Sequence, residues 1–364
     1  MIQGVPTTVN CQIAVVGAGP SGSAAAYYLS GAGFDVCLID RSTFPRDKVC
    51  GDLLGEEAIA ELARLGLEPE ANWFGRCAGV CRWRAVGYTG KKREGSLNVS
   101  GGRLYVIRRT DFDDTLRRRA IAMGARWLSP CRCYHLTRGA SGIFILRGVA
   151  PNKIETQIRA DVVIYANGAG SACEFDERVG LAGRAYYENV NVAETCEFYY
   201  LDYLPLQYAW VFPLPGGLTN VGIGMSLRAL REQHDPLELV LDHVIDRVIG
   251  VHRSFSKARR VLRFQGAVLK TGLQPGRLVR DGVIYIGDAA GMANPWDGEG
   301  IGPALVSARL AAQAICSAWR QGIFKRDEFR GYEEAIRMRY GEVYDRAQRM
   351  FTSRTHLCQL LKPA

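Results

Sequence analysis

Two different patterns of apolar and polar positions occur along the chain, and each predicts a different kind of sheet. Short continuous apolar runs are typical of strands buried on both faces of a parallel sheet. Such runs occupy residues 11–16, 34–39, 161–166 and 283–286. Between about residues 175 and 266, apolar and polar positions alternate instead, as in antiparallel strands with one buried face, and Pro215-Gly216-Gly217 supplies a hairpin turn. The sequence therefore predicts an α/β fold that combines a doubly wound sheet with an antiparallel sheet.

The first apolar run leads into a glycine-rich turn, Gly17-Ala18-Gly19-Pro20-Ser21-Gly22, and then into an Ala-rich helix at residues 23–29. Gly17 permits a tight turn, Gly19 lets a pyrophosphate approach the backbone, and Gly22 lets the helix pack closely on the strand. Pro20 and Ser21 lead into the helix N-terminus, which offers free N–H groups and a positive dipole end to phosphates. This order of elements predicts a dinucleotide site, for which a glycine-rich loop without a ligand is the alternative.

Asp40 follows the second apolar run, about twenty residues after the first glycine, where a carboxylate can accept hydrogen bonds from ribose hydroxyls. The neighbouring Arg41 is assigned to the same cofactor site. The turn and Asp40 do not by themselves distinguish NAD from FAD.

A second strand end, at Gly287-Asp288, precedes the stretch Asn294–Gly302 and a helix predicted at residues 303–319. Asp288 could bind a ribityl or ribose hydroxyl. Gly298, Gly300 and Ile301 could leave N–H groups free for the C2 carbonyl and N1 of a flavin. A strand-to-helix turn with a capping Asp is the alternative. Taken together, the two stretches resemble the two halves of the FAD site in the flavoprotein group of hydroxylases, halogenases and prenyl reductases.

Two further segments resemble that flavoprotein group. Arg109-Thr110-Asp111-Phe112-Asp113 is similar to its Arg-x-x-Phe-Asp segment, which implies that Arg109 approaches the diphosphate. The alternative is an amphipathic helix with a solvated basic face. Residues 161–171 resemble the Ala-Asp-Gly-x-x-Ser motif of flavin hydroxylases, with Asn167 where Asp is usual. No second glycine-rich strand-turn-helix occurs, so an external electron donor is expected, either NAD(P)H or a reduced carrier.

A narrower resemblance rests on residues 44–52 and 205–213. Both are similar to segments of geranylgeranyl reductases, and the second matches their Tyr-x-Trp-x-Phe-Pro signature at every fixed position. The resemblance implies FAD as cofactor and a wall of Tyr208 and Trp210 against a hydrophobic or aromatic substrate. Cys50 would relay a proton or tune the flavin, and Lys48 would hold phosphate or substrate. The alternative for Tyr208 and Trp210 is a buried aromatic strand of a sheet core. The alternative for Cys50 is a small apolar filler, and for Lys48 a solvated side chain.

The predicted domains are discontinuous. Residues 1–75, 106–174 and 267–320 form a Rossmann-like FAD-binding domain, residues 76–105 and 175–266 form the antiparallel substrate domain, and residues 321–364 form C-terminal helices. A helix near residues 236–251 belongs to the substrate domain, and a packing helix with a solvated face covers about residues 325–354.

Three functions remain open at this point. The first choice is the reduction of isoprenoid C=C bonds. The second is a flavin monooxygenase that hydroxylates an aromatic ring, including a Trp of a partner protein during quinone cofactor maturation. The chain has only about 75 residues after Asp288, and a short C-terminus would suit a protein substrate. The third is a flavin-bound assembly factor without catalysis.

Charge and cysteine content narrow the classes of partner, the metal sites and the cellular location that we expect. The chain of 364 residues carries 46 Lys and Arg against 37 Asp and Glu, a net charge of +9, which favours an anionic ligand, an acidic partner or a membrane surface. We expect no nucleic acid, no secretory signal and, without a run of 18 apolar residues, no integral membrane segment. The 11 cysteines are scattered without zinc-site spacing, so no metal and a cytoplasmic location are expected.

Overall fold

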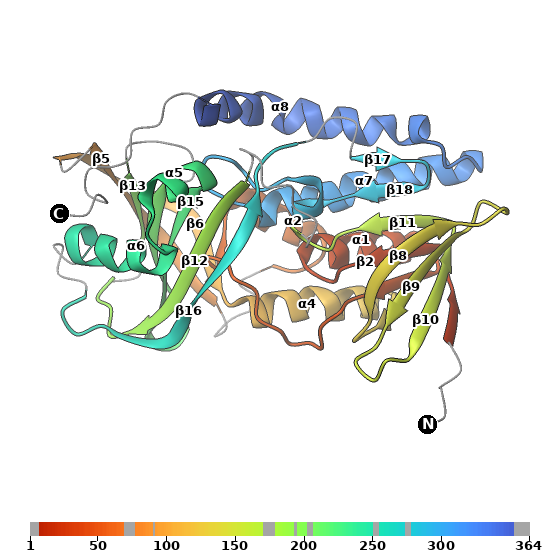
Figure 1. Ribbon diagram of the computed structural model, residues 1–364, viewed down its shortest axis with the longest axis horizontal. Helices are drawn as coiled ribbons and strands as arrows, with labels where there is room; N and C mark the ends of the chain where they lie inside the picture. Colours follow the sequence, from red (N-terminus) through yellow and green to blue (C-terminus); the bar gives the residue numbers. More distant parts are fainter. Residues whose placement is uncertain are drawn as a thin grey trace.

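Three sheets form the frame of the molecule (Figure 1). The computed structural model describes residues 7–68, 77–89, 92–169, 179–192, 195–201, 207–249, 255–273 and 278–352. Parts of three predictions lie outside these residues: Pro205 and Leu206 of the signature segment, Gly170 and Ser171 of the segment at residues 161–171, and the tail beyond residue 352. The predicted domain boundaries stay predictions.

The first sheet has six strands and carries the predicted nucleotide turn. Its strand order is β17-β18-β11-β2-β3-β7, and every pair is parallel except β17 with β18. The strands are β17 (Val279–Arg280), β18 (Val283–Tyr285), β11 (Val162–Tyr165), β2 (Ile13–Val16), β3 (Val36–Ile39) and β7 (Arg126–Leu128). All four residues of β2 and of β3 are buried, as the continuous apolar runs predict.

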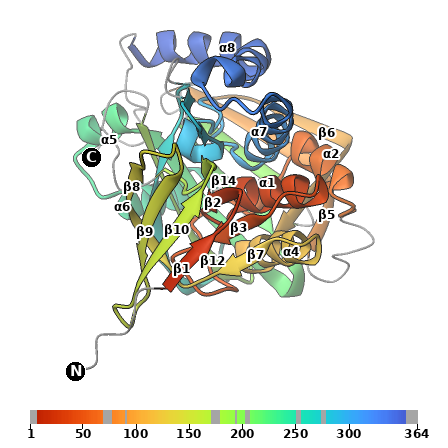
Figure 2. The ribbon, with the colours of Figure 1, turned by 90° about the vertical axis from the view of Figure 1, so that its right-hand side faces the viewer.

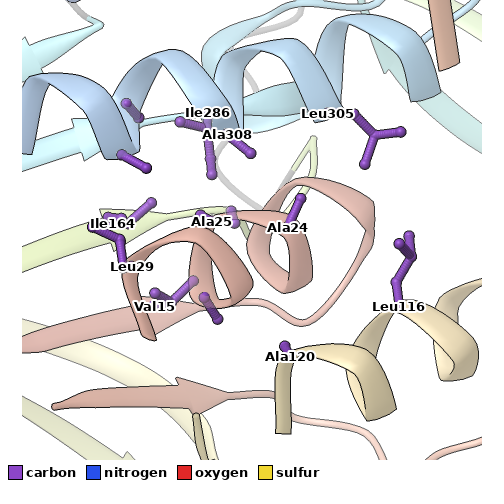
Figure 3. Close-up of a cluster of buried hydrophobic side chains, with 14 of the residues drawn as sticks. Val15, Ala24, Ala25, Leu29, Leu116, Ala120, Ile164, Ile286, Leu305 and Ala308 are labelled. Atoms are coloured by element: carbon purple, nitrogen blue, oxygen red, sulfur yellow. The ribbon is translucent and has the colours of Figure 1, made fainter. Parts of the chain in front are cut away.

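Helices cover this sheet through small side chains (Figure 3). The helix α1 (Pro20–Gly31) packs against α7 (Ile301–Gln321) on one side and against α4 (Arg109–Ala122) on the other. Ala24 and Ala25 of α1 are fully buried beside Leu305 and Ala308 of α7. Because alanines bring the two helix axes close together, the two ends of the nucleotide-binding sequence meet here.

Among the described helices, α7 alone has the length and composition of a membrane-crossing segment. In this fold 67% of its most apolar window is buried. A neighbouring helix, α2 (Glu56–Arg64), packs on it and contributes Glu61 to an ion pair of 2.8 Å with Arg309. The burial of α7 is that of a core helix.

The second sheet has eight strands in the order β16-β12-β15-β14-β13-β5-β6-β4. The strands are β16 (Arg259–Lys270), β12 (Val179–Glu188), β15 (Leu218–Ser226), β14 (Tyr208–Pro213), β13 (Thr195–Leu201), β5 (Cys77–Thr89), β6 (Lys92–Ile107) and β4 (Leu53–Leu54). The predicted hairpin turn at residues 215–217 joins β14 to β15. One pair, β13 with β5, is parallel. The β5–β6 hairpin comes from a separate part of the chain, and the alternation of apolar and polar residues in a strand does not determine the direction in which it pairs.

Short helices cover the outer face of the eight-stranded sheet. They are α5 (Leu227–Gln233) and α6 (Leu237–Val244), followed by a π-helical turn (Ile245–Ile249). The helix expected at residues 236–251 is therefore present as two joined pieces. Val240 and Leu241 of α6 pack on the alternate strand positions that point outward, such as Val211 and Ile223. The strand positions between these residues point to the inner face of the eight-stranded sheet.

The third sheet was not predicted. It has four strands in the order β1-β10-β9-β8 and lies at one end of the molecule (Figure 2). The strands are β1 (Thr7–Asn10), β10 (Glu155–Ala160), β9 (Phe144–Val149) and β8 (Arg132–Arg138). Only one face is apolar, and it packs on the parallel sheet through residues such as Phe144 and Leu146. The charged residues on the other face make its alternation difficult to recognise in sequence.

The last described element, α8 (Arg330–Thr352), runs along one side of the molecule (Figure 1). Its buried tyrosines anchor it to the loops at the ends of the parallel strands. The Tyr332 hydroxyl donates to the Tyr285 carbonyl at 2.8 Å, and the Tyr344 hydroxyl donates to the Met292 carbonyl at 2.6 Å. The packing helix predicted near residues 325–354 is thus found over most of that range.

Candidate functional site

A cavity of about 830 Å³ lies between the parallel sheet and the eight-stranded sheet. Its walls include Gly17, Asp40, Asn167 and Asp288, which all follow the carboxyl ends of parallel strands. In open α/β sheets this edge is where ligands bind. The inner face of the eight-stranded sheet forms another wall, and Arg132, Cys133 and Tyr134 of β8 also line the cavity. Nucleotide-binding and apolar surfaces therefore share one space.

The structure brings nearly all of the predicted site residues to this cavity. The predicted site residues that line it are Gly17, Gly19, Pro20, Ser21, Asp40, Arg41, Lys48, Cys50, Arg109, Tyr208, Trp210, Asp288, Gly298, Gly300 and Ile301. Two predicted residues, Gly22 and Gly287, lie beneath the lining. The roles assigned to each stay predictions.

The three glycines of the first turn differ in their surroundings. At Gly17, where φ is +107°, an added Cβ would lie 2.3 Å from the Ala166 carbonyl oxygen, and at Gly22 it would lie 1.8 Å from the Gly17 carbonyl oxygen. Both positions therefore require glycine for the fold itself. At Gly19 the nearest atom to an added Cβ is the Arg46 Nη2, at 3.6 Å. Gly19 also precedes α1 without a side-chain cap, so it leaves room and N–H donors for a phosphate group.

Asp40 holds the turn in place. Its Oδ2 accepts from the Ala18 N–H at 2.8 Å, and its Oδ1 accepts from the Ser42 N–H at 2.9 Å. Each carboxylate oxygen keeps a further lone pair, so Asp40 can still accept from a ribose hydroxyl.

Two basic residues share one carboxylate at the phosphate end of the cavity. Arg109 is 3% exposed and binds Asp113 through two hydrogen bonds of 2.7 and 2.8 Å. Arg46 also pairs with Asp113, at 2.9 Å, and its guanidinium is the group nearest to Gly19. Sequence analysis missed Arg46, although it lies in the quoted segment 44–52. Its place beside Gly19 suits a diphosphate better than the fully engaged Arg109 does.

The basic face of α4 is not simply solvated, contrary to the sequence-based alternative. Arg117 is bound to Asp114 at 2.7 Å, and the Arg119 Nε donates to the Leu65 carbonyl at 3.1 Å. Only Arg118 of the three is largely exposed, with 71% of its side chain accessible. Asp114 belongs to α4 itself, whereas the Leu65 carbonyl follows α2 and is not included in a helical projection of α4 alone.

In the same cavity, Lys48 is paired with Asp288. The Lys48 Nζ lies 2.9 Å from the Asp288 Oδ2. Burial alone would raise the pKa of Asp288, but the charge and hydrogen bond of Lys48 outweigh it and hold that pKa below its usual value. Asp288 is therefore an ionised acceptor, as a ribityl hydroxyl requires.

The loop before α7 carries a carboxyl group that sequence analysis missed. Glu299 lines the cavity, and its Oε1 accepts from the Gly302 N–H at 3.0 Å. Burial, together with the charges of Asp297 and Glu57, raises the pKa of Glu299 to about 7. The Gly302 N–H, next to the predicted Ile301, is thus occupied, and a carboxyl whose raised pKa is about 7 lines the cavity.

Aromatic rings form the opposite side of the cavity. This aromatic wall consists of Phe198, Tyr200, Tyr208, Trp210 and Phe212 from β13 and β14. The ring centroids of Tyr208 and Trp210 are 5.6 Å apart, and those of Trp210 and Phe212 are 6.2 Å apart. Tyr208 and Trp210, two residues apart on β14, therefore point to one face of the sheet.

Two of the three polar tips of the aromatic wall, those of Tyr208 and Trp210, are hydrogen-bonded within the protein. The Tyr208 hydroxyl donates to the Asp297 carbonyl, and the Trp210 Nε1–H donates to the Asn220 Oδ1 at 2.9 Å. Because these polar atoms already have partners, the ring faces offer an apolar surface to a ligand.

Cys50 stands between the two halves of the site. It is a half-buried free cysteine in the cavity lining. Together with Asp113, its sulfur acts on Arg109, and this pair raises the pKa of Arg109 against the effect of burial. The thiol thus lies beside the Arg109 guanidinium and in the same cavity lining as the aromatic wall, and its role in proton transfer stays a prediction. Among the described residues, no group of three or more His, Cys, Asp or Glu could hold a metal ion.

The residues present fit FAD. An open cradle at Gly19, a helix start without a side-chain cap, a nearby Arg46 and two carboxylates at strand ends match the parts of a dinucleotide. The aromatic wall adds an apolar compartment within the same cavity. Together the fold and this site define a flavin-dependent oxidoreductase.

Comparison with known proteins agrees with the geometry. The model of the FAD binding domain family matches residues 10–195. Menaquinone reductase of Mycobacterium tuberculosis is 30% identical over 94% of this chain and 83% of its own length. Digeranylgeranylglycerophospholipid reductase of Methanocella arvoryzae is 28% identical over 92% of this chain and 84% of its own. The chain belongs to the FAD binding domain family and is an FAD-dependent reductase of the geranylgeranyl reductase and menaquinone reductase group.

Solved structures extend the comparison to the fold. A geranylgeranyl bacteriochlorophyll reductase-like protein from Thermoplasma acidophilum superposes with a TM-score of 0.78 at 22% identity, covering 97% of this chain and 90% of its own. The myxobacterial chondrochloren halogenase gives the same TM-score and identity, covering 98% of this chain and 86% of its own. The fold is therefore shared by reductases and halogenases.

Proposed function

We propose that this protein reduces C=C bonds in the isoprenoid chain of a lipid or quinone. The observation that carries the proposal is the aromatic wall, which faces the glycine turn and Asp288 across one cavity. Apolar side chains of both sheet edges, including Leu53, Leu104 and Leu269, extend that surface. A prenyl chain has no polar atoms to satisfy, so burial against such a surface is its main source of binding free energy.

The names of two relatives support this substrate class. One is a digeranylgeranylglycerophospholipid reductase and another is a menaquinone reductase. Both names pair a reductase with a lipid-soluble molecule. A membrane surface is the natural source of such a substrate, and a net charge of +9 suits contact with anionic lipid headgroups. The protein would work from the cytoplasmic side without an integral segment.

The residues of the chain supply binding and a proton. Reduced FAD, when bound, would supply a hydride, which is two electrons and one proton, so the second proton must come from the cavity. The Cys50 thiol, next to Arg109, and the Glu299 carboxyl both line the cavity. The aromatic wall excludes water and orients the double bond. An external donor, NAD(P)H or a reduced carrier, must restore the reduced cofactor.

Purified protein loaded with FAD tests the proposal. The cofactor is reduced anaerobically, and a geranylgeranyl lipid or a menaquinone is added and then analysed by mass spectrometry. We expect the lipid to gain two hydrogens for each bond reduced, while a fully saturated lipid stays unchanged.

The aromatic wall could also stack on a planar ring, so hydroxylation is the competing function. It predicts that a lipid keeps its mass, and that an aromatic compound or a Trp of a partner protein gains one oxygen when air is admitted. A protein that changes no substrate in either arm, while it keeps its FAD, would be an assembly factor. Either result would overturn the reductase proposal.

A further inference from the structure

A buried polar network lies directly behind the aromatic wall. Asn220, on β15, is fully buried and lies beside Trp210. Its side-chain oxygen accepts from the Trp210 Nε1–H at 2.9 Å. Its Nδ2 donates to the Cys50 carbonyl at 2.8 Å and to the Asp52 Oδ2 at 2.9 Å. One amide therefore connects a ring of the wall to the loop that carries the predicted reactive thiol.

The orientation of that amide is fixed by its partners. The Cys50 carbonyl and a carboxylate oxygen only accept hydrogen bonds, and the indole N–H of Trp210 only donates one. Rotating the Asn220 amide by half a turn would place oxygen against two oxygens and NH₂ against the indole N–H. The network therefore has one favourable arrangement, which holds the indole in one plane.

Asp52 is held firmly as the acceptor. It is 0% exposed, and its Oδ2 also accepts from the Tyr186 hydroxyl at 2.6 Å. Its backbone has a φ of +65°, and its carbonyl accepts from the Ile107 N–H at 2.9 Å. Burial raises the pKa of Asp52 to about 6, with hydrogen bonds from Tyr186 and Asn220 opposing the rise, so the carboxylate is an acceptor at neutral pH.

Asp52 does not reach the substrate space. Its chain neighbours Gly51 and Leu53 line the cavity, but Asp52 is absent from the lining within the described residues. Its Oδ1 has no hydrogen-bond partner in that part of the chain. A buried carboxylate that keeps an unmatched oxygen costs stability, and a wholly structural packing role could be filled by an apolar side chain.

We propose that Asp52 and Asn220 form a positioning pair that fixes Trp210 and Cys50 relative to each other at the reacting end of the cavity. The pair acts through those two residues and touches neither cofactor nor substrate. This inference rests on the proposed function, because the substrate whose double bond must be aligned is the prenyl chain. Loss of the pair should leave the cavity present but poorly aligned.

The first test removes the hydrogen bonds of Asn220 with little change of shape. Asn220→Leu is close in volume, and Asp52→Asn keeps one acceptor oxygen for Tyr186 and Asn220. Thr219→Val is the matched control, because Thr219 is the buried neighbour on the same strand and is 2% exposed. For geranylgeranyl lipid reduction we expect kcat/KM to fall about tenfold or more in Asn220→Leu, because small misplacements of reacting groups are costly. Asp52→Leu removes the acceptor of both Asn220 and Tyr186 and should show a comparable fall. The conservative Asp52→Asn and the control Thr219→Val should stay within about threefold.

A second readout does not depend on turnover. The indole ¹H–¹⁵N signal of Trp210, assigned with Trp210→Phe, should shift upfield in Asn220→Leu and stay in place in Asp52→Asn and Thr219→Val. Asn220→Ser, which is smaller and still polar, replaces Asn220→Leu if that variant does not fold, and should show the same shift.

The outcomes separate this inference from the proposed function. If wild-type protein reduces no prenyl lipid, the proposed function is wrong. The indole signal then still decides whether the pair holds the Trp210 ring. If the indole signal of the Asn220 variant does not move, the pair does not hold the ring. If the signal moves while kcat and KM remain at wild-type values, the pair is structural only. Either of these last two results overturns the inference.

Discussion

Single residues at the nucleotide end of the cavity serve either the fold or the ligand, and the glycines of the first turn illustrate the difference. Gly17 and Gly22 lie against main-chain atoms, so their missing side chains allow β2, α1 and β11 to approach one another. Gly19 borders open space. One motif thus contains two kinds of glycine that only the three-dimensional surroundings distinguish.

This distinction predicts different results for two substitutions. Gly19→Val should fold normally, with a free energy of unfolding within about 1 kcal/mol of wild type, because the new side chain meets only the end of Arg46. It should nevertheless purify without FAD, since the valine occupies the phosphate position. Gly22→Ala should lose stability as well as FAD. Absorbance at the flavin band and urea unfolding measure both effects, and a yellow Gly19→Val protein with full cofactor content would refute the assignment.

The site residues that sequence analysis found differ from those that it missed in how far along the chain their partners lie. Asp40 and Asp288 were found because each stands at a fixed place after a strand. Arg46, Asn220 and Glu299 were missed, because each acquires its role from contacts with distant segments. Asn220, for example, bonds to Cys50, 170 positions away, and no local pattern encodes that distance.

At the scale of elements, the parallel strands and the main helices agree with their predicted positions, with shifted ends. The helix α1 begins at Pro20 rather than at residue 23, and α7 begins at Ile301 rather than at residue 303. The four-stranded sheet and the parallel pairing of β5 with β13 did not follow from sequence. Periodicity indicates which face of a strand is buried, but it does not indicate which distant strand lies beside it.

The contact of α1 with α7 leads to a prediction at this scale. Ala25 is fully buried against α7 (Figure 3), so Ala25→Leu must separate the two helices or strain them. We expect the free energy of unfolding to fall by about 1–3 kcal/mol, the usual cost of overpacking a core. Ala122→Leu, on the exposed last turn of α4, is the control and should change it by less than about 0.5 kcal/mol. Equal stability of the two variants in urea unfolding would contradict this packing.

At the scale of the whole molecule, one loop between β3 and α2 ties the two halves together. Asp47 in this loop accepts from the buried Arg184 of β12 at 2.6 Å, and Lys48 pairs with Asp288. Cys50 bonds through its carbonyl to β15. The nucleotide end and the aromatic wall are therefore fixed relative to each other by residues 47–50.

Cofactor binding should accordingly stabilise the molecule as one unit. FAD at a free concentration one hundred times its Kd should raise the free energy of unfolding by about 2.7 kcal/mol. FMN lacks the adenosine half that Asp40 and Arg41 are assigned to hold, so its effect at the same concentration should be much smaller. Thermal unfolding of cofactor-free protein with each nucleotide measures the difference, and equal shifts would show that the adenosine half makes no contact.

The order of strands in the parallel sheet also constrains biosynthesis. The strand β2 pairs with β11, which pairs in turn with β18, and the apolar face of α1 is covered by α7. These partners leave the ribosome in that sequence, and α7 ends only at Gln321. The apolar face of α1 therefore stays uncovered during translation until α7 has been synthesised.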